Sequence, residues 1–241
     1  MEGQNKMNFI NYAHRGASAY APQNTMMAFY LGMYMGANGI ETDVRVTKDG
    51  VPVLFHDETM DKIIGVDGKI SDYTFEELQK FSITANSRTD KIVAFSDFLS
   101  HFAFRDITFA IELKQKGIYE TVAELIRKYN IVEKTVITSF DYEEVCFMRE
   151  YAPELKCGFL TVEVTDEILT DMKNRGIGEI CPSAASVTPE KVKEWHNMGF
   201  NVRAWGCWDE ELMKKAYDAG VDGMTVNFPD KLIEYIDSKT K

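Results

Sequence analysis

The chain has 241 residues, of which 45% are hydrophobic, so it can bury the core of one large α/β barrel or of two small domains. Its formal net charge of -11 argues against nonspecific nucleic-acid binding and against docking to anionic lipid, because both depend on cationic surfaces. No apolar run is long enough to cross a bilayer, so we expect no membrane insertion.

The cysteines and the amino-terminal residues bear on the cellular compartment. Cys146, Cys157, Cys181 and Cys207 are scattered and form no C-x-x-C pair, which predicts buried or free thiols in a reducing compartment, with a disulfide as the alternative. Residues 1–8 lack the apolar core of a secretory signal. We therefore expect a cytoplasmic protein.

Short apolar strands alternate with helical patterns from end to end, which is typical of repeated βα units. Strands are expected near 8–13, 39–46, 51–55, 107–114, 135–140, 156–161, 178–182, 201–206 and 221–226. Helices are expected near 23–37, 117–130, 141–151, 166–175, 188–198, 209–219 and 229–238. This order predicts a TIM-type (β/α)8 barrel if the strand near 51–55 is an extra hairpin arm, whereas an open doubly wound sheet also fits.

One region interrupts the alternation. Residues 58–106 are rich in turns and short helical segments. We expect a single barrel domain over 1–241, with 58–106 as a small insertion after the second βα region that lies over the active face. A packed excursion without substrate contact fits equally well.

Carboxylates recur at every second residue of two expected strands. Glu41 and Asp43 share one face, and so do Glu112 and Lys114, because residues i and i+2 of a strand point the same way. If both polar faces point inward, the three carboxylates approach, and charges about 5 Å apart repel by roughly 3 kcal/mol at an effective dielectric of about 20. A bound Ca²⁺ or Mg²⁺ would suit such an all-oxygen site, although ion pairs with Arg45 and Lys114 are the alternative.

Two histidines stand beside these carboxylates in the sequence pattern. His14 and His56 follow expected strands, and imidazole serves as acid or base near neutral pH. Either histidine alone would more often be structural, but next to three carboxylates the pair favours catalysis. His101 and His196 lack such neighbours, and we expect them to be surface residues without partners.

An ordered set of short motifs extends along nearly the whole chain. It comprises His14-Arg15-Gly16, Pro22-Gln23-Asn24-Thr25, Ala28-Phe29, Gly36-Ala37, Ile40-Glu41-Thr42-Asp43-Val44, Thr47-Lys48-Asp49-Gly50, His56-Asp57, Ile111-Glu112-Leu113-Lys114, Ser139-Phe140, Ala204-Trp205, and 220–229 with Asn227. Any single motif is a weak signal. The ordered set resembles the glycerophosphodiester phosphodiesterases.

The resemblance implies a TIM-type barrel, one divalent cation, and metal-dependent hydrolysis of small glycerophosphodiesters to glycerol 3-phosphate and an alcohol. It also implies a role for each site residue: Glu41, Asp43 and Glu112 as metal ligands, His14 and His56 as the acid/base pair, Arg15 and Lys114 as phosphate ligands, and Trp205 as a contact of the glycerol. The alcohol, the cation, the division of acid and base roles, and the oligomeric state stay open.

Two positions depart from the family pattern. Gln23 stands where P-E-N-T has a glutamate, and we interpret it as orienting the region of Arg15 or His14, which alters tuning more than it removes activity. The run from Trp205 to Trp208 reads Trp-Gly-Cys-Trp where W-T-V-N is usual. The substrate contacts near Trp205 therefore differ in detail.

Two other functions compete with the leading hypothesis. A phospholipase C-like or lysophospholipase D-like activity on lipids would need an apolar rim or a basic interfacial patch, and the sequence shows neither clearly. A catalytically silent binder of phosphodiesters is encouraged only by Gln23, and both histidines argue against it.

Overall fold

The computed structural model describes residues 9–239, so residues 1–8, which bear on the expected lack of a secretory signal, lie outside the described part. The strands are β1 Ile10–His14, β2 Gly39–Val46, β3 Pro52–Leu54, β4 Ile83–Ala85, β5 Arg88–Asp90, β6 Thr108–Leu113, β7 Thr135–Ser139, β8 Lys156–Thr161, β9 Glu179–Pro182, β10 Asn201–Cys207 and β11 Gly223–Val226. The helices are α1 Met26–Tyr34, α2 Asp61–Ile64, α3 Phe75–Leu78, α4 Phe95–Phe102, α5 Tyr119–Lys128, α6 Tyr142–Tyr151, α7 Asp166–Arg175, α8 Pro189–Asn197, α9 Glu210–Asp218 and α10 Pro229–Lys239.

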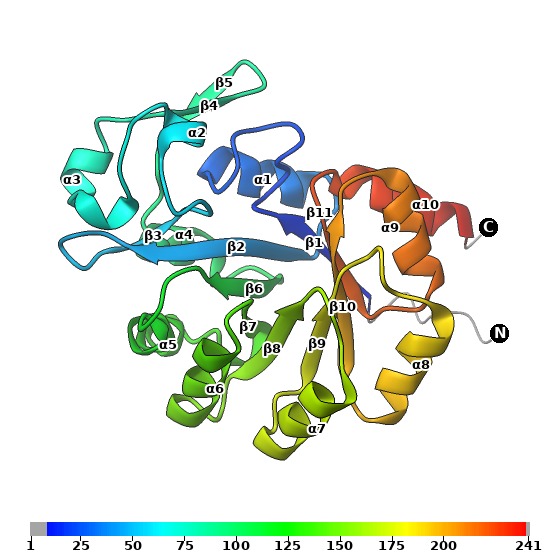
Figure 1. Ribbon diagram of the computed structural model, residues 1–241. Coiled ribbons are helices and arrows are strands. Elements are labelled where there is room, and N and C mark those ends of the chain that lie inside the picture. The colour runs from blue at the N-terminus through cyan, green and yellow to red at the C-terminus, as the bar shows by residue number, and fades with distance from the viewer. Residues whose placement is uncertain (1–8, 240–241) are drawn as a thin grey trace.

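Parallel strands close into a barrel. The main sheet runs β1-β11-β10-β9-β8-β7-β6-β2-β3, and an additional parallel pairing of β1 with β2 closes its parallel strands into a ring, with β3 attached to β2. Helices surround the closed sheet (Figure 1). The predicted TIM-type (β/α)8 barrel is thus confirmed, and the open doubly wound alternative is wrong.

The ninth strand of that sheet, β3, is the predicted hairpin arm. It pairs antiparallel with β2, with Val44 opposite Leu54, after a turn in which Gly50 has a φ of +82°. The hairpin returns the chain toward the carboxyl end of the barrel, where the Phe55 amide donates to the Asp43 carbonyl at 3.0 Å. His56 is therefore delivered to the same end as Asp43.

The alternation along β2 and β6 separates apolar from polar side chains. Ile40, Val44, Phe109 and Ile111 belong to the main core, which the strands form with the surrounding helices. The opposite faces point into the barrel, where Ala110 packs in a small cluster with Tyr12 and Val136. The polar faces of the two strands therefore point inward, the condition on which the carboxylate cluster depended.

Helix α4 was not separately predicted. Phe95, Phe98, Leu99 and Phe102 are buried in the main core, and the Phe29 and Phe98 rings pack with centroids 4.8 Å apart. The spacing of these residues by three and four places them on one face of a helix. This pattern was hidden because the flanking sequence is rich in turns.

The residues between β3 and α4 form a separate small assembly of α2, α3 and the β4–β5 hairpin, which lies beside α1 (Figure 1). Its apolar cluster includes Met60, Ile70 and Leu78. The β4–β5 hairpin contacts the chain that follows β1, since the side-chain amide of Asn86 donates to the Ala19 carbonyl at 3.0 Å.

No helix in residues 9–239 is both long and apolar enough to span a membrane.

The turn after β1 contains a glycine whose replacement should destabilise the protein. A Cβ on Gly16, whose φ is +81°, would lie 2.4 Å from the carbonyl carbon of Ala28. We expect Gly16→Ala to lower the free energy of unfolding by about 3 kcal/mol, because both the backbone conformation and the contact forbid a methyl group. Gly50→Ala is the matched control, since its φ is +82° but its Cβ would meet open space. It should cost about 1 kcal/mol in urea denaturation, and equal losses for the two variants would contradict the close contact.

Candidate active site

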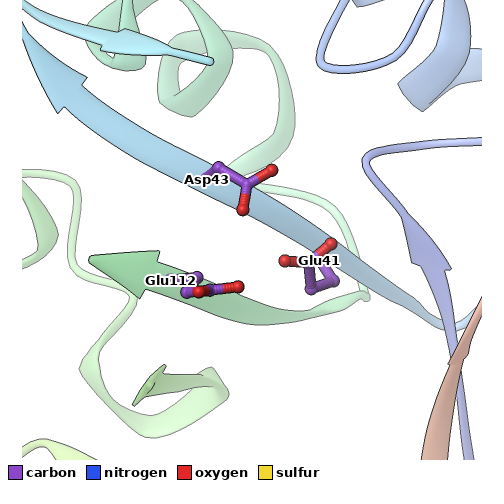
Figure 2. A group of neighbouring side chains, drawn as sticks. All are labelled: Glu41, Asp43 and Glu112. Atoms are coloured by element: carbon purple, nitrogen blue, oxygen red, sulfur yellow. The ribbon is translucent and has the colours of Figure 1, made fainter. Parts of the chain in front are cut away.

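Three carboxylates meet at the carboxyl end of the barrel. Glu41 and Asp43 project from β2 and Glu112 from β6 toward one another, as Figure 2 shows. Asp43 and Glu112 are direct partners in the register of the two strands. One oxygen of each carboxylate lies within 4.8 Å of the others, and all three side chains are buried.

Cations partly neutralise this cluster. The Nε of Arg15 lies 3.1 Å from one Asp43 oxygen, and the Nζ of Lys114 lies 2.5 Å from Glu112 and 3.7 Å from Asp43. The expected alternative ion pair with Arg45 is not formed, because that guanidinium donates to the His56 carbonyl at 2.9 and 3.1 Å. Two cations therefore face three carboxylates.

The remaining negative charge changes the protonation of the cluster. Burial, followed by repulsion from Asp43, raises the pKa of Glu41 to about 8 and that of Glu112 to about 7. Burial also acts to raise the pKa of Asp43, but Arg15 and Lys114 outweigh it and hold that pKa below its ordinary value. The site thus keeps Asp43 ionised and resists ionising its two neighbours.

The donor set fits a hard divalent cation. Asp43 Oδ1 is buried and accepts no hydrogen bond. Buried acceptors in proteins usually have a donor, so this oxygen is available to a ligand. The ligand atoms on offer are all carboxylate oxygens, which Ca²⁺ and Mg²⁺ prefer. The cluster is consistent with a divalent metal site.

Each candidate histidine is anchored through the same ring nitrogen. His14 Nδ1 lies 2.6 Å from Asn227 Oδ1, and His56 Nδ1 lies 2.6 Å from Asp57 Oδ1. Because both partners are acceptors, each Nδ1 carries the proton in the neutral ring. Each Nε2 is then free to exchange a proton.

Both imidazoles favour the neutral form. Burial, reinforced by Arg15, lowers the pKa of His14 to about 3. Burial also lowers the pKa of His56, with a further contribution from Arg15. His14 Nε2 lies 3.9 Å from Glu41 Oε2, so the ring stands directly beside the carboxylate cluster.

Arg15 occupies a strained backbone position. Its φ of 55° is in the left-handed region, which costs a non-glycine residue of order 1–3 kcal/mol. The Arg15 amide donates to the Glu41 carbonyl at 2.9 Å, and Nη1 donates to Gln23 Oε1 at 2.7 Å. Gln23 thus holds the guanidinium beside Asp43, which agrees with its interpretation as an orienting residue.

These groups line a cavity of about 240 Å³. Its walls include His14, Arg15, Glu41, His56, Glu112, Lys114 and Trp205, so the cavity brings together seven of the eight site residues predicted from the sequence. Asp43 lies in direct contact with two of them, Arg15 and Lys114. The Trp205 ring packs edge-on against Phe140, with centroids 4.9 Å apart.

Sequence reasoning missed several supporting residues. Asn227 anchors His14 and also accepts from the Ser18 hydroxyl at 2.9 Å. Asn24 donates to Asp43 Oδ2 at 2.9 Å and accepts from the Thr42 hydroxyl. Asn24 and Asn227 both lie inside the motifs that resemble the family, so these motifs were the sequence signal for a role in the site.

A buried ion pair contributes one side chain to the wall of the cavity. Arg203, which lines it from β10, is 1% exposed, and its Nε lies 2.8 Å from Glu179 Oε1. Nothing in the sequence pattern pointed to this pair, because the two residues lie on different strands.

The expectation that His101 and His196 lack partners is wrong. His101 Nδ1 lies 2.8 Å from the Tyr30 hydroxyl, and His196 Nε2 lies 2.8 Å from Asp222 Oδ2. Both are exposed, and neither lines the site cavity. The partners come from other elements, which the local sequence does not reveal. All four cysteines are buried free thiols, which confirms that part of the prediction, whereas the reducing compartment stays a prediction.

A (β/α)8 barrel that gathers buried carboxylates, cations and imidazoles at the carboxyl ends of its strands has the layout of a TIM-barrel enzyme acting on an anionic ester. Residues 14–231 match the model of the glycerophosphoryl diester phosphodiesterase family. The chain belongs to this family and is therefore a phosphoric diester hydrolase.

Curated relatives extend over nearly the same length. A glycerophosphodiester phosphodiesterase of Caldanaerobacter subterraneus is 30% identical over 239 residues, which is 95% of this chain and 98% of the relative. A glycerophosphodiester phosphodiesterase of Bacillus altitudinis is 30% identical over 235 residues, covering 92% of this chain and 96% of the relative.

Solved structures share the architecture. The glycerophosphodiester phosphodiesterase of Thermotoga maritima superposes with a TM-score of 0.79 at 26% identity, covering 94% of this chain and 98% of that chain. An Oleispira antarctica phosphodiesterase, solved in complex with the product sn-glycerol-3-phosphate, gives a TM-score of 0.85 at 22% identity, covering 96% of this chain and 98% of that chain. At 22% identity, the likeness to the Oleispira antarctica structure is evidence for the fold alone.

Proposed function

We propose that the protein hydrolyses glycerophosphodiesters to glycerol 3-phosphate and an alcohol, with one Ca²⁺ or Mg²⁺ held by Glu41, Asp43 and Glu112. The observation that carries the proposal is the placement of two imidazoles, each anchored through Nδ1, at one cavity with the carboxylate cluster. When bound, the cation would neutralise negative charge on the phosphate oxygens.

Arg15 and Lys114 would bind the phosphate. Both reach the cavity while paired to the carboxylates, so they present fixed positive charge where the transition state spreads negative charge. Arg15 is held on a second side by Gln23, which limits its reorientation when a phosphate enters. Trp205 would pack against the glycerol.

His14 and His56 would move the protons. One Nε2 accepts the proton of the attacking hydroxyl. The other imidazole would be protonated next to the negative charge of a bound phosphodiester, and it gives its proton to the oxygen of the departing alcohol. The attacker is water or the glycerol hydroxyl of the substrate itself. A cyclic phosphate, detected by phosphorus NMR during turnover, distinguishes the second route from the first.

The proposed function has a direct test. Purified protein saturated with Ca²⁺ or Mg²⁺ should release glycerol 3-phosphate from at least one of several glycerophosphodiesters that differ in the alcohol. Absence of release from all of them, with either cation, would refute the proposal. Tight binding to lipid vesicles would instead favour a lipid substrate.

The carboxylate cluster also predicts how stability depends on pH. The pKa values of Glu41 and Glu112 rise from an ordinary value of 4.5 to about 8 and about 7, so folding favours their protonated forms. Stability from these groups is full below the ordinary value and is lost as the pH rises through those values. Asp43 acts in the opposite sense, but only near and below its own ordinary value of 3.8.

Thermal melts from about pH 5 to about pH 9 check this dependence. In chelator the melting temperature should fall across this range, and the stabilisation by Ca²⁺ should grow, because a cation replaces the protons. A stabilisation by Ca²⁺ that did not change with pH would contradict the assignment of these ligands.

Three further expectations stay predictions: the single domain over 1–241, the placement of residues 58–106 over the active face, and the cytoplasmic location.

A further inference from the structure

A second cavity adjoins the site. It has a volume of about 500 Å³ and shares the side chains of Glu112, Lys114 and Phe140 with the site cavity of about 240 Å³. A phosphodiester carries two organic groups on one phosphorus atom. With the phosphate held near Lys114, one group can occupy each cavity.

The site cavity suits the smaller and constant group, the glycerol. Its aromatic walls include Trp205 and Trp208, and the Trp208 ring lies edge-on to His14, with centroids 5.8 Å apart. A bulge in β10 turns Trp208 toward the cavity: the register shifts between Ala204 and Cys207, and Gly206 has a φ of +76°. These walls match the C–H face of a glycerol.

The adjoining cavity is polar. Its walls outside the shared residues include the donors Gln115 and Lys116 and the carboxylates Glu58 and Asp141. The carboxylates already have partners: Asp141 lies 2.9 Å from Lys116 Nζ, and Glu58 lies 2.5 Å from Lys69 Nζ. A third carboxylate of these walls, Glu144, is buried and accepts from the Gly117 amide at 2.9 Å. A cationic ligand would therefore find no unpaired carboxylate among these groups.

The aromatic face in the adjoining cavity already contacts a cation. Phe140 is the one aromatic side chain among the described residues that line this cavity, and Lys114 Nζ lies 5.5 Å from the centre of its ring. A quaternary ammonium group, which binds best over free aromatic faces, would have to displace that contact. Hydroxyl groups both donate and accept, so they can bridge the ion pairs that line the cavity.

We propose that this adjoining cavity binds the alcohol group of the substrate and selects a polyhydroxylated alcohol, such as glycerol or inositol, over choline. The inference rests on the proposed hydrolysis of glycerophosphodiesters and names the class of alcohol.

The test compares kcat/KM for glycerophosphoglycerol, glycerophosphoinositol and glycerophosphocholine. The wild-type protein should prefer at least one polyol diester over the choline diester by about three- to tenfold, the size of one or two net hydrogen bonds. Lys116→Met removes a donor and unpairs Asp141, so the ratio of polyol to choline turnover should fall by about three- to tenfold. Gln115→Leu should lower the ratio in the same direction.

The ratio does not depend on the fraction of folded enzyme, so partial unfolding of a variant does not obscure it. Lys193→Met, an exposed substitution on α8 away from both cavities, is the control and should leave the ratio unchanged. A preference for the choline diester, or an unchanged ratio in both cavity variants, would overturn the inference.

Calorimetric titration of the intact diesters into the wild-type protein in chelator separates this inference from the proposed function. If no diester is hydrolysed but the polyol diesters bind more tightly than the choline diester, the proposed function fails and the cavity assignment holds. If turnover occurs without any polyol preference in binding or kcat/KM, the cavity assignment fails alone.

Discussion

Replacement of His14 by alanine is expected to lower kcat by about 10²–10⁴-fold, the usual contribution of one acid or base. The ring touches the carboxylate cluster through Nε2 and Asn227 through Nδ1, so its removal takes away a proton carrier at the cavity. The measurement is the release of glycerol 3-phosphate at saturating substrate and cation. His56→Ala should show a loss of the same order, since His56 is anchored in the same way.

The control for this prediction is His101→Ala. His101 is exposed on α4 and contacts Tyr30, and it does not line the site cavity. Its variant should retain activity close to that of the wild type. A His14→Ala protein that folds normally and keeps more than about a tenth of the activity would contradict the proposed role of His14. A silent binder would show no turnover in any of these proteins.

Replacement of Glu41 by glutamine is expected to stabilise the metal-free protein while removing its response to cations. The raised pKa of Glu41 means that its ionisation opposes folding near neutral pH. Glutamine keeps an acceptor oxygen for the Arg15 amide, which lies 3.0 Å from Glu41 Oε2, and it carries no charge. The free energy of unfolding in chelator should rise by about 2 kcal/mol.

Addition of Ca²⁺ separates the two proteins. At about one hundred times its dissociation constant, Ca²⁺ should stabilise the wild type by about 2.7 kcal/mol, or roughly 5–10 °C for a chain of this size. Glu41→Gln should lose most of this gain together with most of its activity. A cation response of wild-type size in the variant would exclude Glu41 as a ligand.

Asp43→Asn provides the contrast within the same cluster. Asp43 is ionised and contacts both Arg15 and Lys114, so its neutralisation leaves Arg15 without a carboxylate partner and Lys114 with Glu112 alone. It should destabilise the metal-free protein by about 3–5 kcal/mol. If Glu41→Gln raises the free energy of unfolding and Asp43→Asn lowers it, the cluster is built around an ionised Asp43 and is incomplete without a cation.

The contrast has a general meaning for the fold. The apolar faces of β2 and β6 stabilise the barrel, whereas the polar faces of the same strands gather like charges inside it. The protein therefore gives up stability at the place where the ligands for a cation are held. Functional sites are the places where a protein is expected to hold side chains that do not favour its fold.

The sequence by itself determined the succession of strands along the chain and which carboxylates share a face of a strand. The alternation in Ile40-Glu41-Thr42-Asp43 fixes which side chains share a face, and this property is local to one strand. The repeated βα pattern then limits the ways in which the strands can close. The Asp49-Gly50 pair likewise favours the turn before β3, because glycine readily adopts the positive φ that the chain reversal requires.

Only the tertiary structure decided which partners these side chains have. Asn227 reaches His14 across 213 positions of sequence, and Arg203 meets Glu179 from another strand. Helix α4 joined the main core although its flanks are irregular, and a bulge in β10 brought Trp208 beside His14. The periodicity of a segment determines which of its side chains share a face. Contacts between segments depend instead on register, bulges and loop paths, which are set when the whole barrel closes.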